Sequence, residues 1–124
     1  MSIFNIFYVG IGGFIGAVLR YVISSKLVIG KFPYGTLMVN IIGGILIGLI
    51  MSISDNTHFI SKNLKLFLTT GLMGGLTTFS TFSYETISFF NNGDYALSLI
   101  NIILNISLSL LGVVFGQYLS STII

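Results

Sequence analysis

The stretch that decides the fold is residues 69–85, with the sequence TTGLMGGLTTFSTFSYE. It overlaps an uncharged run over residues 66–84, and crossing a membrane takes about 20 apolar residues in a helix. Near its middle, Gly74 and Gly75 are followed by two β-branched threonines, a combination that weakens a helix. Backbone freed at that depth must be buried in protein or line a cavity. The stretch therefore predicts a broken membrane helix that could coordinate an ion; the alternative is a packing notch in an unbroken helix.

Charge is scarce along the whole chain. Of 124 residues, five are Lys or Arg and three are Asp or Glu, against 54% hydrophobic residues and a mean hydropathy of +1.03. These values exclude a soluble domain and a disordered chain. The net charge of +2 is too small for a nucleic-acid partner, and we expect none. With no cysteine and one histidine, thiol catalysis and Cys or His metal clusters are excluded, and we expect no enzymatic activity.

The few charges and the turn residues near them divide the chain into four apolar segments. We predict four transmembrane helices, over residues 3–24, 36–53, 64–90 and 95–119. Together they form one all-α membrane domain over residues 1–124, with short loops that force neighbouring helices to run antiparallel. A bundle this small has little room for an internal pathway, so an oligomer is expected.

The basic residues are almost evenly divided between the two membrane faces. Lys26 and Lys31 lie in the first predicted loop with Arg20 at the adjoining helix end, whereas Lys62 and Lys65 lie in the second. Because Lys and Arg in short loops set orientation, three against two gives almost no bias. Two interpretations remain open: one orientation set by the first helix, or dual topology, in which both orientations form and pair antiparallel.

Small and polar residues recur at helical spacing within the spans. Small residues four positions apart permit close packing of helix backbones in lipid. They are Gly12 and Gly16 in the first helix and Gly44 and Gly48 in the second. In the fourth helix, Asn101 and Asn105 share one face. They could form helix–helix hydrogen bonds or line a hydrated track for an ion.

Two aromatic residues follow the predicted break. Phe79 and Phe82 are three residues apart and so share a helix face. Aromatic rings are electron-poor at their edges, and edges that point into a narrow passage would attract a small anion. Ordinary lipid or core contact is the alternative. Glu85, the only acidic residue predicted near a span, could bond within a vestibule or reach the membrane interface.

Three motifs together resemble those of the Fluc family of fluoride channels, also called CrcB. They are GGLTTFSTFS at residues 74–83, GGFIGAVLRY at 12–21 and PYGTLMVNIIG at 33–43. The four-span layout and the length also match. The resemblance implies a dual-topology antiparallel homodimer in the plasma membrane. It implies passive, fluoride-selective export that reduces fluoride toxicity, with two pores in each dimer and a central structural sodium ion.

The resemblance also implies roles for individual residues. The carbonyls of Gly74 and Thr77 would hold the sodium ion, and Arg20 would lie near a pore mouth. The fluoride pore would be lined by Asn40, Phe79, Ser80, Thr81, Phe82 and Glu85. Asn101 and Asn105 fall in the polar region of the family's fourth helix and are candidates for a polar track.

Two other classes compete with this interpretation. A small drug or cation antiporter can also be a four-span dual-topology dimer, but it uses a carboxylate embedded in the membrane, usually in the first helix, where this chain has none. A structural or holin-like membrane protein would not need the arrangement around Phe79 and Phe82. Without paired acids in the spans, passive conduction is favoured over proton-coupled exchange.

Overall fold

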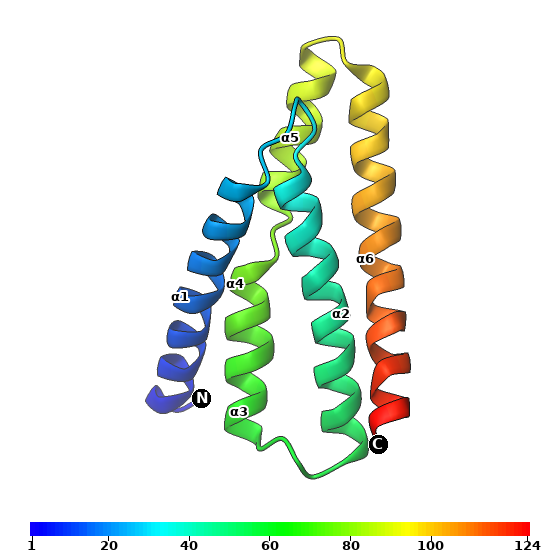
Figure 1. Ribbon diagram of the computed structural model, residues 1–124. Helices are drawn as coiled ribbons and strands as arrows, with labels where there is room; N and C mark the ends of the chain where they lie inside the picture. The colour runs from blue at the N-terminus through cyan, green and yellow to red at the C-terminus, as the bar shows by residue number, and fades with distance from the viewer.

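The computed structural model describes residues 1–124, and every element in it is helical (Figure 1). In chain order the elements are α1 (Ile3–Lys26), α2 (Tyr34–Asn56), α3 (Lys62–Leu66), the π-helix η1 (Phe67–Met73), α4 (Gly74–Leu76), α5 (Ser80–Asn91) and α6 (Tyr95–Ile123). Three of them, α1, α2 and α6, are long and apolar enough to cross a membrane. The third predicted span consists of α3, η1, α4 and α5.

The helices extend slightly beyond the ends predicted from sequence, by one to four residues. The largest difference is at the C-terminus, where α6 continues to Ile123 rather than ending at residue 119. Both chain ends lie at the same end of the bundle as the loop between α2 and α3, and the α5–α6 turn lies at the opposite end (Figure 1). That turn contains Gly93 at φ 83°, a left-handed conformation that glycine adopts without strain.

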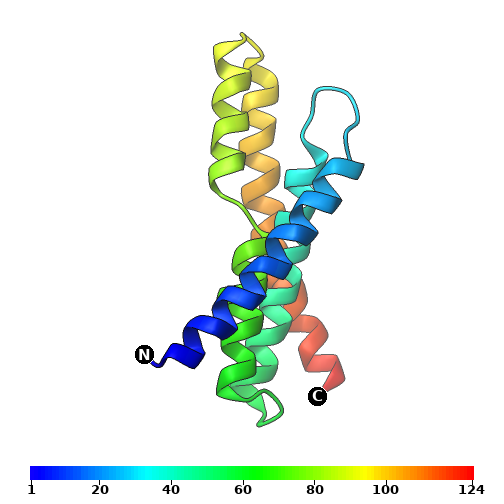
Figure 2. The ribbon, with the colours of Figure 1, turned by 90° about the vertical axis from the view of Figure 1, so that its left-hand side faces the viewer.

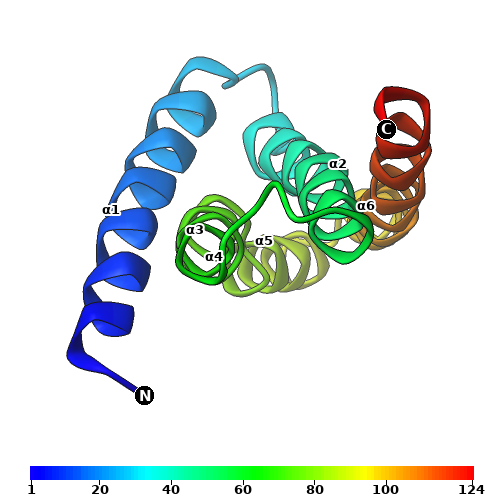
Figure 3. The same ribbon diagram turned by 90° about the horizontal axis from the view of Figure 1, so that it is seen from below.

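The third span changes its packing partner at the break. Its first half, η1 and α4, packs against α1, which crosses it obliquely (Figure 2). Its second half, α5, packs against α6. Seen from below, α1 and α6 lie at opposite edges, with the third span and α2 between them (Figure 3). The broken helix therefore contacts α1 through its first half and α6 through its second half, and α2 contacts α1, α6 and the third span.

Glycines bring helix backbones into direct contact in two pairs, α1 with η1–α4 and α2 with α6, as their spacing predicts. A Cβ added to Gly12 of α1 would lie 2.9 Å from the Leu72 amide nitrogen, and one added to Gly44 of α2 would lie 2.6 Å from the Ser109 carbonyl oxygen. A Cβ added to Gly116 of α6 would lie closer still to the Ile45 carbonyl oxygen. In lipid, where apolar side chains gain little by leaving the solvent, such close packing holds helices together.

The buried apolar core is small and lies beside the break. Val39, Met73 and Leu76 form it. Large hydrophobic side chains cover the rest of the surface, as Phe14 on α1 and Leu110 on α6 do at 72% and 64% exposure. This distribution fits a chain surrounded by lipid.

Candidate functional site

The third span opens at Thr77, within the segment of residues 74–78 where the sequence predicts a break. Gly74 and Gly75 remain helical in α4, whereas Thr77 is extended at φ −84° and ψ 159°. The cause is a tertiary contact: the Thr78 amide donates to Asn40 Oδ1 at 2.9 Å, and Asn40 Nδ2 donates to the Thr78 carbonyl at 3.2 Å. The Asn40 side chain therefore replaces the helix as the hydrogen-bond partner of Thr78.

This arrangement frees two carbonyls that a continuous helix would use. The Thr78 amide, the regular partner of the Gly74 carbonyl, donates to Asn40 instead. The Thr81 amide, the regular partner of the Thr77 carbonyl, donates to Thr78 Oγ1 at 3.1 Å. No cluster of acidic residues or histidine lies in the chain that could hold a metal ion. Backbone carbonyl oxygens are ligands that hard cations accept, so these two could receive a cation.

Arg20 reaches the break from α1. Its Nε donates to the Gly75 carbonyl at 2.9 Å, in a partly buried position. A cation is favourable there because the C-terminal end of a helix carries partial negative charge. Arg20 also lines a polar hollow of about 300 Å³ together with Thr36, Thr81 and Glu85. The structure thus brings the predicted vestibule residue and two predicted pore residues to one place.

Glu85 is held at the wall of this polar hollow. Thr36 Oγ1 donates to Glu85 Oε2 at 3.1 Å, which connects α2 to α5. The other carboxylate oxygen, Oε1, is buried without a hydrogen-bond partner. Ser80 and Thr81, which carry hydroxyls, are exposed at the start of α5, one to two helical turns before Glu85.

Phe79 and Phe82 lie side by side, as their spacing predicts. Their ring centroids are 5.6 Å apart, and the ring planes are tilted by 59°. Phe82 is buried at 7% exposure, whereas Phe79 is 77% exposed in the single chain. Both rings line an open groove of about 550 Å³, between the break and the facing surfaces of α2 and α6. Gly74 and Thr77 line the same groove.

Asn101 and Asn105 are buried on α6, at 0% and 4% exposure. Asn105 Nδ2 donates to Asn101 Oδ1 at 3.0 Å, and Asn101 Nδ2 donates to Thr86 Oγ1 of α5 at 2.9 Å. Asn40 Nδ2 donates to Asn105 Oδ1 at 3.0 Å. Of the two interpretations left open by the sequence, this geometry corresponds to helix–helix hydrogen bonding.

Sequence reasoning missed Thr86 and Ser98. The Ser98 hydroxyl donates to the Thr86 carbonyl at 2.9 Å, so both residues fasten α5 to α6. Thr86 follows Phe82 by one helical turn, and this spacing could have identified it. No motif or spacing in the sequence around Ser98 predicts its bond to α5.

Comparisons with known proteins agree on one family. The sequence model described as CrcB-like protein, Camphor Resistance (CrcB), matches residues 7–117, which include the whole break. The chain is 60% identical over 118 residues to the "Fluoride-specific ion channel FluC" of Clostridium novyi (strain NT), covering 93% of this chain and 92% of the relative. It is 48% identical over 122 residues to the protein of the same name from Ruminiclostridium cellulolyticum, covering 96% of this chain and 94% of the relative. The chain belongs to the CrcB family.

Proposed function

We propose that this chain is a fluoride-selective passive ion channel, a multi-pass protein of the plasma membrane. The observation that carries the proposal is its 60% identity, over nearly the full length of both chains, to a relative named as a fluoride-specific ion channel. The geometry is compatible with that function, because the break gathers aromatic rings, hydroxyls and one arginine at mid-span. Channel activity would let cytoplasmic fluoride leave the cell down its electrochemical gradient and so reduce its toxicity.

Fluoride is small and strongly hydrated, so a selective path must replace its water. The hydroxyls of Ser80 and Thr81 can donate hydrogen bonds, and the ring edges of Phe79 and Phe82 supply weaker positive potential. Asn40 would act differently from a free donor. Both hydrogens of its amide donate to protein acceptors, so its first contribution to the pore is to hold the backbone before Phe79.

The functional unit in this proposal is an antiparallel homodimer with two pores. Two features of the single chain support a second copy: Phe79 is 77% exposed, and the groove beside it is open. The charges support dual topology. The Arg20 side chain is turned into the protein, which leaves Lys26 and Lys31 on one face against Lys62 and Lys65 on the other.

The proposal includes a structural sodium ion held by the Gly74 and Thr77 carbonyls. Both carbonyls have lost their helical partners, and hard cations prefer such neutral or anionic oxygen ligands. One chain offers too few ligands to enclose the ion, and a symmetric copy would supply the rest. The ion would provide positive charge near the midplane. Replacing sodium by N-methylglucamine should therefore lower the unfolding temperature of the purified protein, and an unchanged value would contradict the site.

Flux from liposomes tests the proposed function. Purified protein is reconstituted in vesicles loaded with potassium fluoride, valinomycin sets the membrane potential, and an electrode records external fluoride. We expect fast fluoride efflux and no chloride efflux under the same conditions. Proton-coupled exchange of an organic cation without fluoride flux would instead establish the antiporter. Equal leakage of both anions would favour a non-selective membrane protein.

Cysteine labelling tests the dual topology. Because the chain has no native cysteine, only the introduced thiols can react. Ile29→Cys in the first loop and Phe59→Cys in the second introduce thiols at sites that are 64% and 77% exposed. In cells, a membrane-impermeant thiol reagent should label about half of each variant from outside, because both orientations are present. Complete labelling of one variant and none of the other would contradict dual topology.

A further inference from the structure

A continuous series of hydrogen bonds crosses the molecule from the break to the carbonyl of Phe82. We call its four linking side chains the amide chain: Asn40, Asn105, Asn101 and Thr86. Each donates to the next, over 3.0 Å, 3.0 Å and 2.9 Å. At one end Asn40 Oδ1 accepts from the Thr78 amide, and at the other Thr86 Oγ1 donates to the Phe82 carbonyl at 2.8 Å.

The contact with Thr78 at the break decides which atom of each side chain in the amide chain donates and which accepts. No amide in the series can be flipped without losing a hydrogen bond. Asn40 faces both the N–H and the C=O of Thr78, so its amide fits in one orientation only. Its Nδ2 therefore points at Asn105, which must present Oδ1 and donate onward to Asn101. By the same reasoning Asn101 presents Nδ2 to Thr86.

Burial separates Asn101 and Thr86 from the groove beside the two rings, which Asn40 and Asn105 help to line. Asn101 is 0% exposed, Asn105 4% and Thr86 6%. Their hydrogen-bond partners are protein groups, with Asn105 Nδ2 also donating to the Asn101 carbonyl at 2.9 Å. A buried polar group that loses such a partner is costly, which makes a fully bonded series a strong constraint on geometry.

We propose that Asn101 and Thr86 are positioning residues for the fluoride site, and that they do not bind the ion. Through Thr86 the amide chain sets where the Phe82 carbonyl and ring lie, and through Asn40 it sets the backbone that carries Phe79. Three separate elements, α2, α5 and α6, are thereby held in one register around the pair of rings. The inference rests on the proposed channel function and assigns part of its selectivity to residues outside the pore.

The test compares two substitutions of Thr86. Thr86→Val keeps the shape but removes the hydroxyl, so Asn101 loses its acceptor and the Phe82 carbonyl loses its side-chain donor while keeping its helical one. Thr86→Ser retains the hydroxyl. In reconstituted vesicles we expect Thr86→Val to lose roughly tenfold in fluoride flux relative to chloride, and Thr86→Ser to resemble the wild type. Thr122→Val is the matched control, because Thr122 Oγ1 donates only to the carbonyl of Leu119, three residues earlier in α6 and away from the groove.

A spectroscopic readout separates positioning from loss of folding. 4-Fluorophenylalanine placed at position 82 in each variant reports the ring's surroundings through its ¹⁹F chemical shift. The shift should move in Thr86→Val and stay in Thr86→Ser and Thr122→Val. If Thr86→Val does not fold, the double variant Asn101→Leu/Thr86→Val removes both polar partners, and removing both can be nearly neutral for stability.

The outcomes distinguish this inference from the proposed function. A folded double variant with low, less selective flux supports positioning, whereas wild-type flux and an unmoved ¹⁹F shift in the folded valine variants would overturn it. Absence of fluoride flux in the wild type would contradict the channel itself. In that case the ¹⁹F shift alone still reports whether the amide chain positions Phe82.

Discussion

Two kinds of contact hold this small bundle together, and they differ in what they specify. In the glycine-packed pairs, α1 with η1–α4 and α2 with α6, backbones touch without intervening side chains. Around the break, by contrast, side-chain amides and hydroxyls bond one element to another. Close packing brings helices together in lipid but carries little directional information. The hydrogen-bonded region fixes the orientation of individual groups, as a selective ion site requires.

The largest expected effect comes from removing a ring beside the break. Phe82→Ile or Phe79→Ile should nearly abolish fluoride flux while the dimer persists. The helix packing within each chain should also persist, because the glycine-packed pairs are untouched. Flux from liposomes and size-exclusion chromatography measure the two properties separately. Phe14→Ile is the control, since that ring lies on the exposed side of α1 at 72% exposure. Normal flux in both pore variants would refute the role assigned to the rings.

The next effect belongs to the glycine-packed pairs and should fall on stability. A Cβ at Gly12 would lie 2.9 Å from the Leu72 amide nitrogen, whereas one at Gly13 would lie 3.9 Å from the Gly71 carbonyl oxygen. Gly12→Ala should cost about 1–3 kcal/mol through overpacking, and Gly13→Ala should be tolerated. Thermal unfolding in detergent compares the two neighbours. Equal stability of both variants would mean that this contact does not hold α1 in place.

A smaller effect is expected where the two kinds of contact meet. Arg20 belongs to α1 but donates to the Gly75 carbonyl at the break. Arg20→Met keeps much of the apolar stem and removes the donor, so stability should fall by about 1.5 kcal/mol. Arg20→Lys, which retains a positive charge, should lose less. If Arg20→Met were as stable as the wild type, the bond to Gly75 would contribute nothing beyond the apolar stem.

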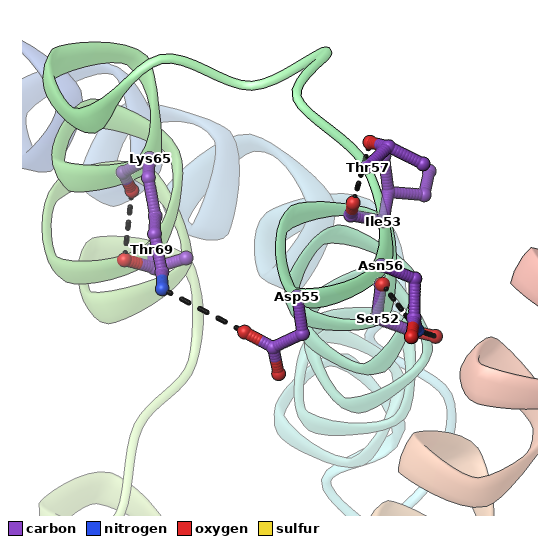
Figure 4. Close-up of polar contacts among 7 residues, drawn as sticks. All are labelled: Ser52, Ile53, Asp55, Asn56, Thr57, Lys65 and Thr69. Atoms are coloured by element: carbon purple, nitrogen blue, oxygen red, sulfur yellow. Dashed lines mark hydrogen bonds and ion pairs between the residues drawn. The ribbon is translucent and has the colours of Figure 1, made fainter.

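The smallest effect is expected at the loops, outside both regions. Lys65 and Asp55 are 4.0 Å apart between the start of the third span and the end of α2 (Figure 4), and Lys31 and Asp94 are also 4.0 Å apart at the other end of the molecule. Exposed pairs of this kind contribute about 0.2–1 kcal/mol. Asp55→Asn and Asp94→Asn should therefore change the unfolding temperature only slightly, and less in high salt. A large loss in either would place a structural role in the loops.

Most of the glycine-packed architecture was predictable, because spacing within one helix is visible in the sequence. The positions of Gly12 and Gly44 identified contact faces correctly. The break lies within the predicted segment, but the residue at which it opens was not predictable. Gly74 and Gly75 remain helical, and the chain opens at Thr77 because Asn40, distant in sequence, captures the backbone of Thr78. Propensity cannot report such a tertiary contact.

Two further features of the break were not predictable for the same reason. The π-helix over Phe67–Met73 has no signature in residues 67–73 that separates it from an α-helix. Arg20, expected near a pore mouth, also bonds to the Gly75 carbonyl, a contact that depends on how α1 crosses the third span. The sequence left two interpretations of Asn101 and Asn105, helix–helix hydrogen bonding or a hydrated track. Their burial and the bond from Asn101 to α5 favour the first, and neither is visible in the sequence.

The most direct test of passive, fluoride-selective conduction is the reversal potential of currents through the reconstituted protein in a planar bilayer. With unequal fluoride concentrations and chloride as the competing anion, the current should reverse at the equilibrium potential of fluoride. Imposing a pH gradient should not move that potential. A reversal potential that follows the proton gradient, or that treats chloride and fluoride alike, would contradict the account.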